Sequence, residues 1–294
     1  MRCLLIGASG QLGRALHAVF SSGHEVIATA HRHVGPGYLR LDLGDVQGTR
    51  RLLREINPDL VLIAGAMCAV DRCESERDLC RRVNVDGPRA VAEYGHERGA
   101  RVVYFSTDHV FDGTREAYGE TDAIRPLSFY AASKAEGEGA LRQLLSDRHL
   151  VIRTSWLYGP DARRMNFALR CVDSIRAGRS VPVPEDQWGS PTYTEDLAQA
   201  TRFLVEHGYI GTFHATGPEF VDRASLTLRI CAHFGLDQGC IVAKPTSELA
   251  QAAPRPLRVR LDCAKLREAG VSPFRGIDRG LEALAAFEAL VSKR

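Results

Sequence analysis

Short apolar segments alternate with amphipathic segments through the first half of the chain. The apolar segments have the length of β-strands and cover residues 4–6, 25–30, 60–64, 101–105 and 149–153. Helical periodicity marks residues 12–20, 49–56 and 83–98 between them. Strands that alternate with helices pair in parallel, because a tight hairpin cannot join parallel strands. Since these strands are almost wholly apolar, both sheet faces must be covered. The pattern predicts an α/β fold with a doubly wound parallel sheet.

The regular alternation fades after about residue 155, where proline and glycine become more frequent. We therefore expect two units. Residues 1–152 form the sheet unit, and a segment at 192–213 returns to it. Residues 153–294 form a smaller lobe.

Composition excludes several classes of partner. The chain has 294 residues, 45% of them hydrophobic, and a formal net charge of +2. Such a charge gives no basic field for nucleic acid. No apolar run approaches the ~20 residues that span a bilayer, and the first one meets Gly7 too early for a signal peptide. We expect a cytoplasmic protein that binds neither nucleic acid nor a membrane.

The cysteines do not indicate disulfides or a metal site. All eight lack a C-x-x-C spacing, and several lie in apolar or helical segments, where cysteine behaves as a small hydrophobic residue. Without a secretory signal, we interpret them as reduced thiols. We assign no metal ligand.

A glycine-rich turn follows the first strand and opens the first helix. It reads Gly7-Ala8-Ser9-Gly10-Gln11-Leu12-Gly13. Glycines let the backbone turn tightly and approach a pyrophosphate, and the helix N-terminus supplies amide donors. A plain structural turn is the alternative, but the position between strand and helix favours a dinucleotide site. The fold is then of the Rossmann type, with residues 1–152 as the dinucleotide-binding domain and residues 153–294 as the substrate-binding lobe.

The end of the second strand indicates which dinucleotide binds. NAD enzymes usually carry an acid there for the ribose 2′-hydroxyl. Here His31 and Arg32 follow Ala30, and Arg32 suits the 2′-phosphate of NADP. We expect NADPH, with NADH as the alternative if Arg32 is only a solvated loop residue.

A catalytic pair is indicated at Tyr130 and Lys134. Residues four apart share one face of a helix, and a nearby ammonium lowers the pKa of a phenol. The pair can donate a proton to a carbonyl oxygen while a hydride reaches the carbon. Thr107, at the end of an apolar strand, can bind the same oxygen. A Y-x-x-x-K spacing alone is common, and the two preceding motifs make it specific.

These motifs resemble the extended short-chain dehydrogenase/reductase family and, within it, the dTDP-4-dehydrorhamnose reductases. The resemblance covers nearly the whole chain. It also includes Ser106–Gly113, Gly137-Glu138, Arg153–Gly159, Asn166-Phe167, Asp186–Thr192 and Arg255-Pro256.

The resemblance implies reduction of the 4-keto group of a nucleotide-linked 6-deoxyhexose, with Tyr130 as proton donor. It extends the cofactor site to Asp42, Leu43, Ala64, Gly65 and Ala66. The substrate residues that it implies are Cys68, Thr107, Asp108, His109, Trp156, Asn166 and Arg255. Some members of the family dimerise with Mg²⁺, so the resemblance leaves a homodimer open, but no spacing in this chain demonstrates a Mg²⁺ site.

The chain departs from the family pattern at two places. A tyrosine and a threonine usual after the fourth strand are replaced by Met67 and Cys68, and a late Asn-Ser pair is replaced by Arg258-Val259. These departures leave the sugar and the base open.

Other functions share this scaffold. Dehydratases usually carry glutamate where this chain has His109, and epimerases generally show the NAD-selecting acid that is missing here. A non-catalytic subunit similar to that of methionine adenosyltransferase is the main alternative, although such a module needs neither Tyr130 nor Lys134.

Several residues also have a purely structural interpretation. Trp156 can be core packing, Arg255 an exposed strand residue, and His109 can face away from the site. Asn84 is expected to shape its helix, and Asp71 and Glu74 to cap or to lie in loops.

Overall fold

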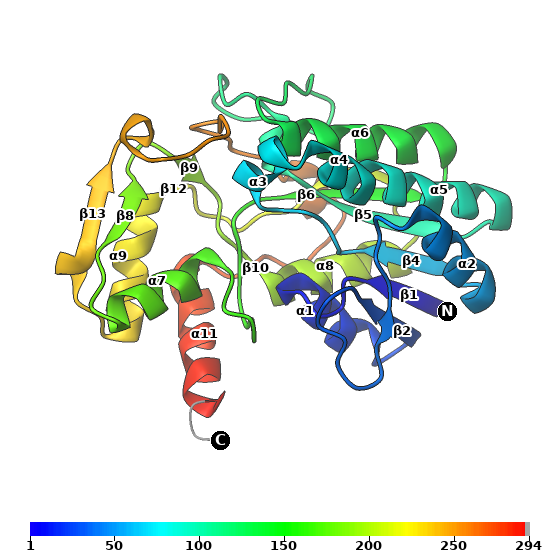
Figure 1. Cartoon of the computed structure of the whole chain (residues 1–294), viewed down its shortest axis with the longest axis horizontal. Helices are drawn as coiled ribbons and strands as arrows, with labels where there is room; N and C mark the ends of the chain where they lie inside the picture. The colour runs from blue at the N-terminus through cyan, green and yellow to red at the C-terminus, as the bar shows by residue number, and fades with distance from the viewer. Residues whose placement is uncertain (292–294) are drawn as a thin grey trace.

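Seven parallel strands form the central sheet of the protein, which was obtained as a computed structural model describing residues 1–291. Their order is β11-β6-β5-β4-β1-β2-β3 (Figure 1). The bounds are β1 Arg2–Ile6, β2 Glu25–Ala30, β3 Leu39–Arg40, β4 Leu60–Ile63, β5 Arg101–Thr107, β6 His149–Thr154 and β11 Gly211–His214. From the central pair β1 and β4, the strands continue outward in chain order on both sides, through β2 and β3 on one side and through β5, β6 and β11 on the other. The predicted doubly wound parallel sheet is therefore confirmed.

Helices cover both faces of the sheet, as the apolar strands require. α1 (Gln11–Phe20) and α8 (Thr194–Glu206) pack on the face that receives Leu5. α2 (Val46–Ile56), α5 (Gly87–Arg98) and α6 (Phe129–Leu144) pack on the face that receives Leu4. Successive side chains of a strand point to opposite faces, so both residues are fully buried. The two helical layers lie above and below the sheet in Figure 1.

A chain of short elements joins β4 to α5 along the upper layer. α3 (Val70–Ser75) and α4 (Arg77–Arg81) lead into a π-helical turn at Arg82–Asp86. Between β5 and α6, a short 3₁₀ turn at Asp108–Val110 opens the connecting loop.

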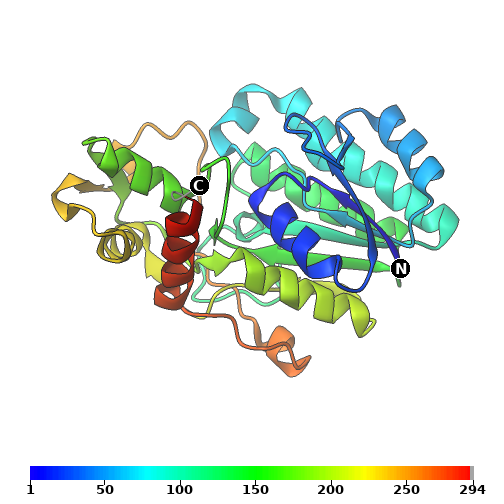
Figure 2. The same ribbon diagram turned by 90° about the horizontal axis from the view of Figure 1, so that it is seen from below.

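The second body is a small lobe with a core of its own. Its elements are β7 Leu157–Tyr158, α7 Phe167–Arg176, β8 Val181–Pro184, β9 Trp188–Gly189, β10 Thr192–Tyr193, β12 Val221–Asp222, α9 Arg223–Phe234, β13 Ile241–Lys244 and α11 Ile277–Val291, with 3₁₀ turns at Gln238–Cys240 and Thr246–Glu248. Of the three two-stranded sheets, β8-β13 and β9-β12 pack against α9, and β7-β10 contacts α8 through β10. Leu169, Leu226 and Leu281 belong to its apolar core. Figures 1 and 2 show α11 at the side of the lobe that faces the sheet unit.

The chain crosses between the two bodies more than once. α8 and β11 belong to the sheet unit, within and just beyond the segment 192–213 that was expected to return. α10 (Ala264–Glu268) also packs there, through Leu266.

A buried ion pair ties α6 to the sheet. The guanidinium of Arg153, on β6, donates to both carboxylate oxygens of Glu138 at 2.9 and 2.7 Å. Both side chains are at most 1% exposed. A buried pair of this geometry fixes orientation, because losing either partner leaves an uncompensated charge. It therefore holds the helix that carries Tyr130 and Lys134.

Within residues 1–291, no helix combines the length and the apolar character that crossing a membrane requires.

Candidate active site

The glycine-rich turn lies where β1 meets α1, and Gly7 and Gly13 in it are sterically required. Gly7 has φ +89°, and a Cβ there would lie 2.6 Å from the amide nitrogen of Gly65. A Cβ on Gly13 would lie 2.1 Å from the carbonyl oxygen of Gly7. A Cβ on Gly10, by contrast, would lie 3.4 and 3.7 Å from its nearest atoms. Gly10 therefore lies beside a small open cradle. A Cβ would fill that cradle, which fits the close approach of a diphosphate to the N-terminus of α1.

The flanking residues connect the turn to the lobe. Ser9 and Leu12 are buried beside the glycines. The side-chain amide of Gln11 donates to the carbonyl oxygen of Leu157 on β7 at 3.3 Å. Arg163, from the loop before α7, is the residue 3.7 Å from the Cβ position of Gly10. The turn therefore has an arginine from the lobe beside it, which no sequence motif marked.

The end of β2 carries two exposed basic side chains. His31 lies 3.5 Å from Asp42, whose other carboxylate oxygen accepts from the amide of Gly44 at 2.9 Å. Arg32 forms no hydrogen bond or ion pair within residues 1–291. Leu43 is buried against α5 through Gly87. Arg32 is thus available for an anionic group at this edge of the sheet.

The loop after β4 is fixed by a buried asparagine. Ala64 donates its amide to Ile6, and Gly65 packs beneath Gly7, with Ala66 next in line. Asn84 accepts from the amide of Met67 at 2.9 Å and donates to its carbonyl oxygen at 3.1 Å.

Asn84 also donates to the hydroxyl of Ser133 on α6 at 3.0 Å. Asn84 is 1% exposed, and its side chain bonds to neighbouring protein groups. This placement fits the structural role that the sequence analysis gave it. The loop that ends at Cys68 is thereby locked to the helix of Tyr130.

Tyr130 and Lys134 lie one turn apart near the start of α6, which is capped by Ser128. Both are buried, with 8% and 3% of their surface exposed. The ammonium of Lys134 lies 3.8 Å from the ring centre of Tyr104. Thr107, at the end of β5, lies close enough to Tyr130 to influence the pKa of its phenol. The structure therefore brings together all three residues predicted to be catalytic.

Burial dominates the electrostatics of the pair. It raises the pKa of Tyr130 well above its usual range, while the neighbouring Thr107 side chain lowers this pKa by less. It lowers the pKa of Lys134 to about 8. The sequence argument gave the ammonium the leading influence on the phenol, but removal from water outweighs it here. Tyr130 consequently keeps its proton at neutral pH, the state that a proton donor needs.

Asp108 and His109 lie beside the catalytic residues. Asp108 is buried and accepts from Thr107 at 3.1 Å and from Ser155 at 2.6 Å. The ring of His109 lies 6.1 Å from that of Tyr130. Desolvation lowers the pKa of His109, and its Nδ1 is buried without a partner in the part of the chain that the structure describes. His109 therefore offers a neutral imidazole beside the site.

Trp156 occupies an unusual backbone conformation. Its φ is +44°, which a bulky residue rarely adopts. Its ring packs on Gly189, where a Cβ would lie 2.5 Å from ring carbon Cε2. Such strain persists only where surrounding contacts hold it, and it is frequent in functional sites.

Two of the other predicted substrate residues have protein partners. The side chain of Arg255 donates to both carboxylate oxygens of Asp71, at 3.0 and 2.7 Å. Asn166 caps α7 through the amide of Leu169 and donates to Gly159. Cys68 is exposed and adjoins Tyr130.

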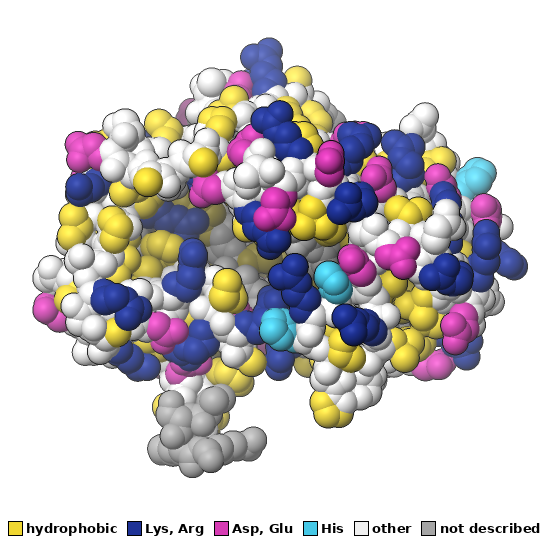
Figure 3. All heavy atoms as spheres, viewed as in Figure 1, with side chains coloured by type: hydrophobic (Ala, Val, Ile, Leu, Met, Phe, Trp, Pro, Cys, Tyr) yellow, Lys and Arg dark blue, Asp and Glu magenta, His cyan; other side chains and the backbone are white. Residues whose placement is uncertain are grey.

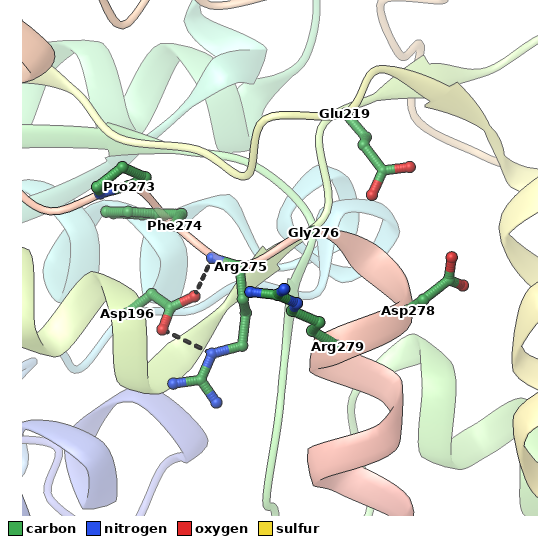
Figure 4. Close-up of a pocket in the computed structure, with 8 residues that line it drawn as sticks. All are labelled: Asp196, Glu219, Pro273, Phe274, Arg275, Gly276, Asp278 and Arg279. Carbon is green, nitrogen blue, oxygen red and sulfur yellow. Dashed lines mark hydrogen bonds and ion pairs between the residues drawn. The ribbon is translucent and has the colours of Figure 1, made fainter.

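A hollow lies away from these residues, between α8 and the start of α11 (Figure 4). Its carboxylates are already paired: Asp196 with Arg275, and Glu219 and Asp278 with Arg229. We assign it no ligand. No group of three His, Cys, Asp or Glu side chains arranged for a metal ion occurs within residues 1–291.

Comparison with known proteins identifies the family. A family model described as RmlD substrate binding domain matches residues 1–288. The chain belongs to this family. A dTDP-4-keto-6-deoxy-D-glucose reductase of Streptomyces niveus is 35% identical over 278 residues, 93% of each chain. Methionine adenosyltransferase 2 subunit beta of Pongo abelii is 29% identical over 293 residues, 95% of this chain and 87% of the relative.

Solved structures of the family share the whole fold. The crystal structure of dTDP-4-dehydrorhamnose reductase from Bacillus anthracis in complex with NADP has a TM-score of 0.88 and 29% identity, and covers 97% of this chain and 99% of that one. The predicted resemblance, the Rossmann-type fold and the assignment as a reductase are confirmed.

Proposed function

We propose that this protein reduces the 4-keto group of a nucleotide-linked 6-deoxyhexose with NADPH. The observation that carries the proposal is the buried cluster of Thr107, Tyr130 and Lys134 beside the glycine-rich turn. The reductase relative and the NADP-bound structure support the substrate class and the cofactor.

The residues of the sheet unit divide the tasks of cofactor binding. Gly7, Gly10 and Gly13 form the cradle for the diphosphate at the start of α1. Arg32 binds the 2′-phosphate as a guanidinium that forms no ion pair within residues 1–291. Lys134 donates to the nicotinamide ribose, and the reduced nicotinamide, when bound, supplies the hydride.

Tyr130 and Thr107 stabilise the negative charge that develops on the carbonyl oxygen. Thr107 transfers its hydroxyl hydrogen bond from Asp108 to the substrate carbonyl oxygen and orients that oxygen toward Tyr130. As the hydride reaches the carbonyl carbon, the carbon–oxygen π bond breaks and its electron pair takes the phenol proton of Tyr130. Lys134 stabilises the resulting phenolate until a proton returns from solvent.

The test is NADPH consumption by the purified protein with dTDP-4-keto-6-deoxy sugars. Turnover with formation of the alcohol is expected. A protein that binds NADPH tightly but reduces none of these substrates contradicts the proposal.

That outcome favours a second candidate, a non-catalytic regulatory subunit, for which the methionine adenosyltransferase relative is the supporting observation. Capture of a synthetase subunit by the purified protein then distinguishes the two. An epimerase is less well supported, since no carboxylate immediately follows β2.

A further inference from the structure

An arginine that no motif marks lies in the wall of the lobe. Arg223 is the first residue of α9, directly after the N-cap Asp222. Its guanidinium carbon lies 3.5 Å from the ring centre of Trp156 and 4.5 Å from that of Phe167. Stacking between two aromatic rings holds the planar guanidinium in one orientation, which leaves its N–H edge to bind a ligand.

This guanidinium has no counter-ion in the described protein. Within residues 1–291, Arg223 forms no side-chain hydrogen bond and no ion pair. Two other arginines of the lobe differ: Arg164 and Arg229 are each paired with two carboxylates.

The pKa values show the same contrast. Desolvation lowers the pKa of Arg223 to about 9, whereas hydrogen bonds to carboxylates raise the pKa of Arg164 and Arg229. A desolvated cation without a partner costs free energy, so an anion bound there would be stabilised.

The position of Arg223 connects it to the catalytic residues. Desolvation is the main cause that lowers the pKa of His109, which lies beside Tyr130, and the charges of Arg255 and Arg223 add to this lowering. Asp108 is the acid with the largest influence on the pKa of Arg223. Because Asp71 already holds Arg255, Arg223 is the better placed of the two arginines to take an anion. Figure 3 shows a hollow between the two bodies, with Lys and Arg side chains on its wall.

We propose that Arg223, stacked between Trp156 and Phe167, binds the diphosphate of the nucleotide-sugar substrate. This assignment rests on the proposed function, which requires a nucleoside diphosphate beside the site of the keto group. The planar fork of a guanidinium matches two phosphate oxygens. Anchoring the diphosphate at the lobe leaves the sugar to reach Thr107 and Tyr130.

The experiment is calorimetric titration of the full-length protein with dTDP and, separately, with thymidine. Arg223→Met removes the charge but keeps an unbranched side chain between the rings. We expect it to weaken dTDP binding by about 10- to 100-fold, the loss of charge-assisted hydrogen bonds. Thymidine binding should not change. The matched control is Arg279→Met, an exposed arginine of the other hollow, which should bind dTDP like the parent.

The outcomes separate this inference from the reductase proposal. Equal dTDP affinity in the parent and Arg223→Met overturns the inference, as does a parent that does not bind dTDP. A parent that binds dTDP through Arg223 but reduces no keto sugar leaves the inference standing and contradicts the reductase proposal. If a thermal melt shows that Arg223→Met does not fold, Arg223→Gln is titrated in its place, with the same expectation.

Discussion

The two walls of the candidate active site are assembled in different ways. In the sheet unit, the groups come from short continuous segments: the turn Gly7–Gly13 and the pair Tyr130 and Lys134, four residues apart. In the lobe, Trp156, Phe167 and Arg223 come from three separate segments and meet only in the fold. Asn84 also fastens the first wall through several hydrogen bonds, whereas within residues 1–291 the guanidinium of Arg223 in the second wall forms no hydrogen bond or ion pair.

This difference suggests a division of labour. A locally encoded wall that is fixed by hydrogen bonds suits chemistry, because proton transfer needs fixed geometry. A wall built from distant segments can change residue by residue without disturbing that geometry, and it suits substrate selection. Substitutions in the sheet unit should therefore alter kcat and cofactor affinity, and substitutions in the lobe should alter KM.

The largest effect is expected at Tyr130. Tyr130→Phe keeps the buried ring but removes the proton, so kcat should fall by about 10²–10⁴-fold, the usual contribution of a general acid. NADPH affinity and Tm should stay near those of the parent. Steady-state kinetics and a thermal melt measure both.

The control for this substitution is Tyr94→Phe. Tyr94 is another buried phenol of the sheet unit, and it donates to Asn57 and Pro58 away from the site. That variant should keep its turnover. Full activity of Tyr130→Phe on a keto-sugar nucleotide would exclude Tyr130 as the proton donor.

Lys134→Met should lower kcat and NADPH affinity together, by about tenfold or more for affinity, because the ammonium acts on both the phenol and the ribose. The pKa of Lys134 is lowered to about 8 in the folded protein. Its charge is therefore present below this pH and lost above it, so the Kd of the parent for NADPH should rise above pH 8.

The folding stability of the parent should change with pH in the opposite direction to its NADPH affinity. Since the unfolded chain keeps the lysine proton to about pH 10.4, it binds more protons than the folded protein above pH 8, and stability rises with pH in that window. In Lys134→Met, both pH dependences should flatten. A variant that retains the parent's pH profile for NADPH binding rules out Lys134 as the titrating group.

Much of the first wall could be predicted from sequence because its signals are local. Apolar strands, helical periods and the glycine turn each lie within a few residues, and the sheet follows from parallel pairing. The helix expected over residues 49–56 starts earlier in the structure, because its N-cap was not recognised in the sequence. This helix, α2, begins at Val46, where the side chain of Asp45 accepts from the amide of Gly48. The π-helical turn before α5, which positions Asn84, leaves no trace in hydrophobic periodicity.

The second wall was less predictable because its contacts are tertiary. Nothing in the sequence around Trp156 announces its positive φ, and Arg223 looks like an ordinary first residue of a helix. The departure at Val259 is explained only by the fold, since this residue is buried against Val110 and Phe111. Its neighbour Arg258 stacks on Trp188 instead, at 4.4 Å from the ring centre.

Cofactor choice should depend on Arg32 more than on the rest of the sheet unit. Arg32→Ala should weaken NADPH binding by about tenfold or more, as expected for a charge-assisted contact to phosphate. NADH binding is the internal control and should be unchanged, because NADH lacks the 2′-phosphate. Titration of both nucleotides decides the matter. A parent protein that binds NADH as tightly as NADPH would show that Arg32 is only a solvated loop residue.

The smallest effect is expected at Arg255, because Asp71 already holds its guanidinium. Arg255→Ala should raise KM by only a few-fold, roughly the 0–1 kcal/mol of a partly exposed ion pair, and leave NADPH affinity unchanged. If the pair serves mainly to fasten the segment at Ala253 to α3, Asp71→Ala should raise KM equally. The double variant should then add nothing further.

A pH profile sharpens this test. The hydrogen bond from Arg255 lowers the pKa of Asp71, so any stabilisation by the pair is complete above the ordinary value of about 3.9 and is lost as the pH falls through the lowered value. Asp71→Ala should remove this acid-side loss. If Arg255→Ala instead raises KM far more than Asp71→Ala does, Arg255 contacts the substrate itself, and the diphosphate is shared between Arg255 and Arg223.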